Sequence, residues 1–193
     1  MKFKDTQLPL IEVPPGQIWH RVQLKRALKQ SVRINNLVLA PFGGLENRFD
    51  LPDESVAYLA DSPETALYER FFRRKVTSLH IQQFEKRVLI SVKSVASLRL
   101  VDVRNLAEQY PVLVSERLAS TQALAAACRQ SDVHGILYAS AQHPQHACVC
   151  LFLSGVARIK KVAATELLQP GTGLMHTALV MAARGSQIPI LKD

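Results

Sequence analysis

Residues 56–72 read VAYLADSPETALYERFF, and this stretch decides the fold because it joins a short apolar strand to a capped helix. The run Val56–Ala60 is typical of a buried strand. Ser62 then supplies an N-cap side chain, and Pro63 stands at the first helical position, where its missing N–H costs nothing. The helix is expected to end near residue 74. A strand that passes directly into a helix indicates a sheet covered by helices.

The segments that follow combine strands and helices without regular alternation. The stretch 77–103 predicts two or three strands, a helix begins at Ser120, and HGILYAS (134–140) and HACVCLFLSG (146–155) predict two core strands. VARIKKV (156–162) carries charges typical of an edge strand. We therefore expect an α+β fold with a mixed β-sheet and flanking helices.

Three parts of the chain differ in composition. Residues 1–15 contain three prolines and predict a loosely attached N-terminal arm, and the first core segment is IWHRVQL (18–24). The main domain is expected over residues 16–155, and residues 156–193 form an extension packed on the same domain. The turn-rich stretch 31–53 is a candidate binding loop, because glycines there let the backbone approach a ligand closely.

Bulk composition narrows the class of protein. A chain of 193 residues with 48% hydrophobic residues suffices for one domain with its own core. An odd count of three cysteines and the lack of a recognisable signal peptide predict a cytoplasmic protein. No apolar run approaches the roughly 20 residues that a membrane span needs. The net charge of +8 favours anionic partners: nucleic acid, a phosphorylated metabolite or an acidic protein.

Several motifs occur together in one order along the chain. They are HRV at 20–22, GGLENRFD around Arg48, YLADSPETALYE from Tyr58 to Glu69, LRLVDV at 98–103, TQALA at 121–125, and HGILYASAQ, which contains Ser140. In these motifs the chain resembles the RES domain family, named for a characteristic arginine, glutamate and serine. The resemblance covers roughly residues 17–154, and its most specific part is the succession of Arg48, Tyr58 and Glu69.

The resemblance implies both a fold and an activity. The fold is that of ADP-ribosyltransferase toxins, a split mixed sheet around an NAD cleft. The activity is breakdown of NAD by phosphorolysis, with inorganic phosphate as co-substrate, or by hydrolysis, or transfer of ADP-ribose to a protein. The implied partner is an Xre-type antitoxin that carries the DNA-binding helix-turn-helix, so this chain itself is not expected to bind nucleic acid. The implied active site comprises Arg48, Tyr58, Glu69 and Ser140.

The residue types suit this chemistry. Cleavage of the nicotinamide–ribose bond builds positive charge on the ribose, as in glycoside hydrolysis, and the Glu69 carboxylate can stabilise that charge. Without the resemblance, a surface ion pair with Arg73 at i+4 would be the simpler interpretation of Glu69. Arg48 has the planar fork that grips a pyrophosphate or an incoming phosphate, although a solvated loop arginine is the alternative, and Arg21 is a second candidate for the same anion.

Tyr58 and Ser140 complete the expected site. The Tyr58 ring is expected to form a pocket wall on which nicotinamide stacks, and otherwise it is a core tyrosine. Ser140 ends an apolar strand, where a hydroxyl can meet a ligand. Its assignment depends on the resemblance, because a lone serine carries almost no signal.

Three other interpretations stay open. His143, His146, Cys148 and Cys150 offer zinc ligands, but strand alternation puts both cysteines on one face, which favours buried thiols and no metal. A Ser–His hydrolase at Ser140 lacks the Gly-x-Ser-x-Gly elbow. A catalytically inactive basic binding module is compatible with the net charge, although the basic residues are scattered and no nucleic-acid recognition motif occurs.

Overall fold

The fold is built on one eight-stranded sheet in the computed structural model, which describes residues 8–114 and 118–192. Its strands are β1 (Leu10–Val13), β2 (Ile18–Leu24), β5 (Ala57–Ala60), β7 (Arg87–Ser94), β8 (Leu98–Asp102), β9 (Gly135–Ala139), β10 (Ala147–Leu151) and β11 (Ile159–Glu166). They lie in the order β1-β8-β9-β10-β5-β2-β7-β11. The β8–β9 pair is parallel, whereas the other neighbours are antiparallel, so the predicted mixed sheet is confirmed.

The sheet is nearly divided in two at its middle. Strand β2 pairs with β5 only through His20 and Ala60, although it pairs with β7 along its whole length from Ile18 to Leu24. Two halves, β1-β8-β9-β10-β5 and β2-β7-β11, therefore diverge from one point of contact. This is the split sheet that the resemblance to the RES domain family implied.

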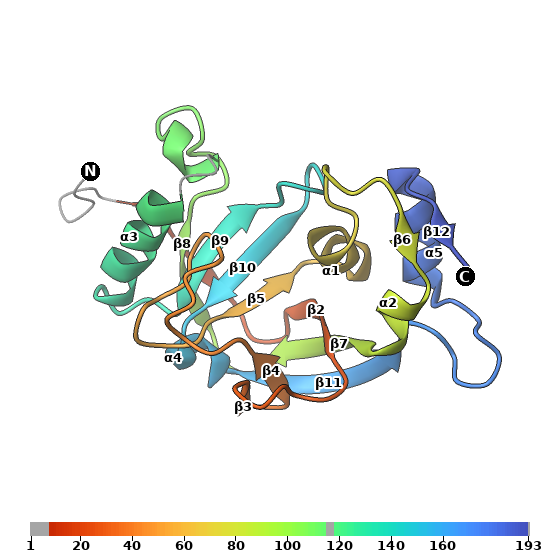
Figure 1. Ribbon diagram of the computed structural model, residues 1–193. Coiled ribbons are helices and arrows are strands. Elements are labelled where there is room, and N and C mark those ends of the chain that lie inside the picture. The colour runs from red at the N-terminus through yellow and green to blue at the C-terminus, as the bar shows by residue number, and fades with distance from the viewer. Residues whose placement is uncertain (1–7, 115–117, 193) are drawn as a thin grey trace.

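Helices and short strands surround the sheet (Figure 1). The helices are α1 (Pro63–Arg70), α2 (Gln82–Glu85), α3 (Leu118–Arg129), α4 (Leu153–Val156) and α5 (Thr177–Ser186), with a 3-10 helix at Pro111–Val114. Two small sheets pair β3 (Val32–Ile34) with β4 (Leu37–Leu39), and β6 (Leu79–His80) with β12 (Ile190–Leu191). Helix α1 contacts β2 and β5, so it lies beside the split. Within the described residues, no helix has the length and apolarity to cross a membrane.

Local sequence explains where α1 begins and ends. The Ser62 hydroxyl accepts a hydrogen bond from the Thr65 backbone N–H at 3.1 Å, and Pro63 opens the helix, as predicted. The helix stops at Arg70, four residues earlier than expected, and Phe71 and Phe72 turn into the core. Burial of these two aromatic side chains outweighs the helix propensity of the basic residues that follow.

Two apolar clusters pack on opposite faces of the sheet. Strand β10 shows the alternation: Cys148 and Cys150 belong to the cluster beneath α1, α3 and α5, whereas Val149 and Leu151 belong to the other cluster. The prediction of two cysteines buried on one face is therefore confirmed. Burial raises the pKa of both thiols, so they stay protonated and unreactive at neutral pH.

Both ends of the described chain are integrated into the fold. Leu10–Val13 pair with β8 as an edge strand, so the expectation of a loosely attached arm is wrong for these residues, while residues 1–7 lie outside the described part. The prolines at 14 and 15 end this strand and leave it intact. In the extension after residue 155, β11 forms the opposite sheet edge against β7, and α5 packs against α1.

Candidate active site

A cleft of about 600 Å³ opens where the sheet splits. Its lining comes from β2, β5, α1 and the 38–56 loop region, which are far apart in sequence. Arg21, Arg48, Tyr58 and Glu69 all line it. Ser140 does not line the cleft directly but contacts Glu69 from behind. The structure thus brings the five sequence-predicted residues into one neighbourhood.

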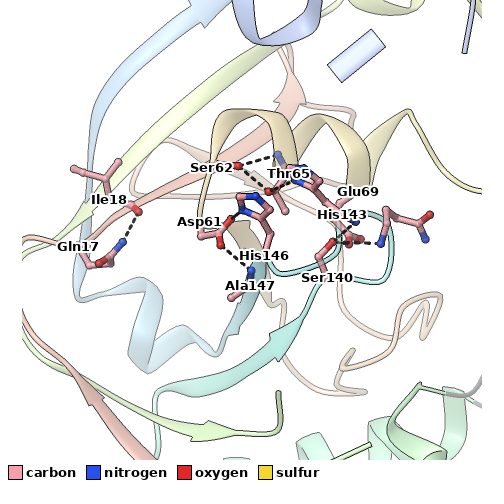
Figure 2. Close-up of polar contacts among 11 residues, drawn as sticks. Gln17, Ile18, Asp61, Ser62, Thr65, Glu69, Ser140, His143, His146 and Ala147 are labelled. Carbon is pink, nitrogen blue, oxygen red and sulfur yellow. Dashed lines mark hydrogen bonds and ion pairs between the residues drawn. The ribbon is translucent and has the colours of Figure 1, made fainter. Parts of the chain in front are cut away.

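Glu69 and Ser140 form a tight pair (Figure 2). Glu69 lies in the last turn of α1, Ser140 follows β9, and the Ser140 hydroxyl donates to Glu69 Oε1 at 2.6 Å. The same hydroxyl oxygen accepts the backbone N–H groups of Gln142 at 3.2 Å and His143 at 2.9 Å. A serine hydroxyl has one proton to donate and two lone pairs, so these two acceptor contacts direct its proton to Glu69. Ser140 is therefore built to orient the carboxylate.

His143 anchors the turn that carries Ser140. Its Nδ1 lies 2.8 Å from the Thr65 hydroxyl, which in turn lies 2.7 Å from the Ser62 hydroxyl at the start of α1. The His143 ring stacks between Tyr68, with centroids 4.4 Å apart, and His146, with centroids 3.9 Å apart. Partial burial and the neighbouring His146 ring lower the pKa of His143, although Asp61 and Glu64 oppose this shift.

The far end of this turn is held by Asp61. One carboxylate oxygen of Asp61 lies 3.0 Å from His146 Nδ1, and the other accepts the Ala147 backbone N–H at 2.7 Å (Figure 2). Turn 140–146 is thus fastened to the strand-to-helix junction that begins α1 at two points, at its middle through His143 and at its C-terminal end through His146. The position of Ser140 relative to Glu69 follows from this double attachment.

Tyr58 holds the arginine loop in place. Its hydroxyl donates to Asp50 Oδ1 at 3.0 Å and accepts the Phe49 backbone N–H at 2.9 Å. Burial, first of all, raises the pKa of Tyr58 well above its ordinary value, with Cys150 and Asp50 adding to the shift. The Tyr58 hydroxyl is therefore engaged by Phe49 and Asp50, the neighbours of Arg48, and the residue also lines the cleft.

Arg48 is clamped between aromatic rings. Its guanidinium lies 5.1 Å from the Phe49 ring centroid and 5.3 Å from that of Tyr138, and it donates to the Leu113 carbonyl. Its Nε is buried without a hydrogen-bond partner among the described residues. The solvated-loop interpretation of Arg48 therefore does not fit.

Arg21 spans the split between the two half-sheets. From β2 it donates to the Tyr58 carbonyl on β5 at 2.9 Å and to the Val38 carbonyl at 3.3 Å. Its Nε is also buried and unpartnered within the described part of the chain. Burial, together with the nearby Arg70 cation, lowers the pKa of Arg21 to about 10. A buried cation with only carbonyl partners is costly unless an anion joins it.

The geometry decides between several interpretations of single residues. Arg73 donates to the Glu69 backbone carbonyl at 2.9 Å, so the expected surface ion pair with the carboxylate does not form. His143 meets Ser140 through its backbone N–H, and its imidazole binds Thr65, which leaves no Ser–His nucleophile pair there. Among the described residues, no group of three His, Cys, Asp or Glu side chains is placed to hold a metal ion.

Sequence reasoning missed several residues of this site. Asp50 binds Tyr58, and Thr65 and His143 form the anchor of the Ser140 turn. Asp50 directly follows the GGLENRF run, and Thr65 lies three residues after the N-cap. Both residues therefore lie in or beside motifs that the sequence already indicated. Their partners are 8 and 78 residues away along the chain, and only the fold shows the pairing.

The fold and the cleft together define a split-sheet α+β domain with a glutamate–serine pair facing buried arginines. The sequence profile of the RES domain matches residues 19–169, and the chain therefore belongs to the RES domain family. The fold is similar to that of a chain in the crystal structure of the M. tuberculosis MbcT-MbcA toxin-antitoxin complex, at a TM-score of 0.57 and 15% identity. The match covers 81% of this chain and 86% of the other. The comparison with curated proteins gives no match.

Proposed function

We propose that this protein is the toxin of a cytoplasmic RES–Xre toxin–antitoxin pair and that it cleaves the nicotinamide–ribose bond of NAD. Membership of the RES family supports the toxin role, and so does the shared fold with a chain of a complex described as toxin–antitoxin. The observation that carries the chemistry is the Glu69 carboxylate, oriented by Ser140, in the lining of a cleft that Arg21 and Arg48 also line.

The reaction requires different things of Glu69 and of the two arginines. As the C–N bond breaks, its electron pair stays with the ring nitrogen, nicotinamide leaves as a neutral molecule, and the ribose carbon becomes cationic. Glu69 stabilises this cation electrostatically, since its carboxylate is fixed in advance by Ser140. An incoming oxygen then forms the new C–O bond. Water gives ADP-ribose and a proton, whereas inorganic phosphate gives ADP-ribose-1''-phosphate.

The arginines suit the anionic part of NAD. The pyrophosphate carries two negative charges, and a guanidinium contacts phosphate oxygens through two parallel N–H groups. Arg21 and Arg48 both line the cleft, and no ion pair in the described part of the chain neutralises either guanidinium, so an anion in the cleft would find two cations available. Tyr58 lines the cleft, and its hydrogen bond to Asp50 holds the loop that carries Arg48 in position.

The proposed partner is an Xre-type antitoxin in a hetero-oligomer, with the antitoxin carrying the DNA-binding helices. A chain with a net charge of +8 attracts an acidic partner over long range, which supports this pairing. Co-expression with a cognate Xre-type antitoxin should yield a complex that co-elutes in size-exclusion chromatography and lacks NAD turnover. A complex that still consumes NAD at the rate of the free chain would contradict the toxin–antitoxin assignment.

The test of the activity is incubation of the purified chain with NAD, with and without inorganic phosphate, followed by chromatography of the products. Glu69→Gln should abolish NAD loss, while Glu64→Gln, on the same helix and outside the cleft lining, should leave it intact. Phosphate dependence would identify phosphorolysis, and label transferred to a protein would identify an ADP-ribosyltransferase. Persistence of NAD under all conditions would instead favour a catalytically inactive basic binding module.

A further inference from the structure

A second cavity, of about 510 Å³, adjoins the cleft and is strongly basic. Four cationic side chains line it, namely Arg70, Arg73, Lys86 and Arg87, and we call it the arginine pocket. Among the described residues, no Asp or Glu contributes to its lining. It shares Leu24, Arg70, Arg73 and Arg87 with the lining of the main cleft, so a ligand in the cleft can reach into it.

The position of these cations is not explained by the end of helix α1. The helix dipole accounts for basic residues such as Arg70 and Arg73 in and after its last turn. Lys86, the C-cap residue of α2, and Arg87, the first residue of β7, come from other elements and line the same cavity. None of the four takes part in an ion pair in the described part of the chain. Surface cations are ordinarily interspersed with carboxylates, and here they are concentrated.

Two of the cations are held in position. The Arg87 guanidinium lies over the Phe71 ring, 5.6 Å from its centroid, and Arg73 Nε is bound to the Glu69 carbonyl at 2.9 Å. Burial lowers the pKa of Arg70 and Arg87, and neighbouring cations add to both shifts, Arg73 for Arg70 and Arg70 for Arg87. Crowded, partly desolvated cations of this kind repel one another until an anion neutralises them.

We propose that the arginine pocket binds a phosphate group next to the NAD cleft. A dianionic phosphate matches several N–H donors converging without an acidic competitor, and two sources share this chemistry. One is the 2′-phosphate of NADP, which would extend the substrate range of the cleft. The other is free inorganic phosphate, the co-substrate of phosphorolysis. The assignment of these two sources rests on the proposed function, whereas phosphate binding itself does not.

The test measures binding without turnover. Calorimetric titrations in phosphate-free buffer use the Glu69→Gln protein with three probes: inorganic phosphate, NAD and NADP. Arg87→Gln in this background should weaken binding of the relevant phosphate about tenfold or more, as expected for loss of a charge-assisted hydrogen bond. Arg99→Gln removes the same charge from an exposed position on β8, which four strands separate from β7, and should change binding less than about twofold.

The two sources give different results. If the pocket takes the 2′-phosphate, NADP binds more tightly than NAD, and Arg87→Gln removes that preference while NAD affinity is unchanged. If it takes free phosphate, NADP and NAD bind alike, and Arg87→Gln weakens only the affinity for phosphate. Arg70→Gln provides a second variant, and thermal unfolding checks that both are folded.

The proposal is overturned if Arg87→Gln and Arg70→Gln, both folded, leave phosphate affinity and the NADP preference unchanged. It is also overturned if Arg99→Gln has an equal effect, because the binding would then reflect overall charge. Failure of the NAD activity has a separate signature. In that case the wild-type chain leaves NAD intact, while the titration with inorganic phosphate still reports on the pocket.

Discussion

Two groups of residues at the cleft differ in how many of their polar atoms have hydrogen-bond partners within the protein. We call them the glutamate wall, which contains Glu69, and the arginine wall, which contains Arg21 and Arg48. On the glutamate wall, formed by α1 and turn 140–146, the Ser140 hydroxyl uses its proton and both lone pairs, and both histidine rings have partners. On the arginine wall, Arg21 and Arg48 keep buried Nε atoms without partners among the described residues. No ion pair within the described residues neutralises either guanidinium.

This difference indicates which polar groups the protein holds in place by itself and which ones a ligand can bind. A fully bonded network holds its groups in a fixed geometry before substrate arrives, which is what stabilisation of a developing charge requires. Buried donors without acceptors carry a desolvation cost of about 1–3 kcal/mol each, which a ligand can offset. We therefore expect changes on the glutamate wall to affect turnover and changes on the arginine wall to affect binding.

The largest effect is expected for the Glu69–Ser140 pair. Glu69→Gln should lower kcat about a thousandfold and Ser140→Ala about a hundredfold, because the first removes the charge and the second only its orientation. The double variant should be no slower than Glu69→Gln, since the two residues act as a unit. Steady-state kinetics on NAD measure this, with Ser131→Ala, an exposed serine at the end of α3, as the control. Multiplicative losses would show that the pair is not coupled.

A smaller effect, and of a different kind, is expected on the arginine wall. Arg21→Gln should weaken NAD binding about 10- to 100-fold, the loss typical of a hydrogen bond to a charged group, with a smaller change in kcat. NAD should also raise the melting temperature of the wild-type chain and not that of this variant. Arg104→Gln, whose guanidinium pairs with Asp102 on β8, is the control. A fall in kcat at unchanged affinity would reverse the roles assigned to the two walls.

A modest pH effect is expected from His143. Its pKa in the folded chain lies below the ordinary value of 6.5, so the unfolded chain takes up the proton first as the pH falls. The contribution of His143 to stability is therefore full above about pH 6.5 and is lost below it. NAD turnover should fall only at lower pH, as the folded chain reaches the lowered pKa of His143, because a protonated His143 disturbs the stack with His146 that anchors the Ser140 turn.

Variants separate the two consequences of this protonation. His143→Asn should flatten the acid limb of both stability and turnover. His134 also has a pKa lowered by burial, but its ring accepts the Arg99 backbone N–H, away from the cleft lining. His134→Asn should therefore flatten only the stability profile, measured by thermal unfolding between pH 5 and pH 8. Identical effects of the two variants on turnover would rule out a positioning role for His143.

The smallest effect is expected at the contact between α5 and α1. A Cβ atom at Gly185 would lie 2.4 Å from the Tyr68 hydroxyl, and the Tyr68 ring stacks on His143. Gly185→Ala should cost about 1 kcal/mol of folding free energy through overpacking and lower kcat less than about threefold. Chemical denaturation and NAD kinetics measure both, with exposed Met181→Ala on the same helix as the control. Unchanged kcat with the expected loss of stability would show that α5 does not influence the glutamate wall.

The sequence predicted local elements well where the signal was local. The cap at Ser62 and Pro63 placed the start of α1, and the alternation around Cys148 placed Cys148 and Cys150 on one face of β10. It was less reliable where distant partners decide. Leu10–Val13 became an edge strand because β8 offered an unpaired edge, and α1 ended early because Phe71 and Phe72 had a core to enter.

The candidate site shows the same division. Arg48, Tyr58, Glu69 and Ser140 were predicted as the site from an ordered set of motifs, since the residue types and their order along the chain are properties of the sequence. Their hydrogen-bonding roles were not, because Tyr58 binds Asp50 and Ser140 binds Glu69 across 71 residues of chain. The arginine pocket was missed because its cations come from two separate segments, 70–73 and 86–87, which only the fold brings to one cavity.

The sequence by itself determined the class of fold, the family and the chemical groups available, because each depends on patterns within a few turns or strands. Only the tertiary structure decided that β2 and β5 meet at a single residue pair, which opens the cleft. It alone decided which polar groups have partners and which are left for a ligand. The physical reason is that hydrogen bonding and burial depend on residues brought together from distant parts of the chain, and these distances are fixed only when the sheet and its helices pack.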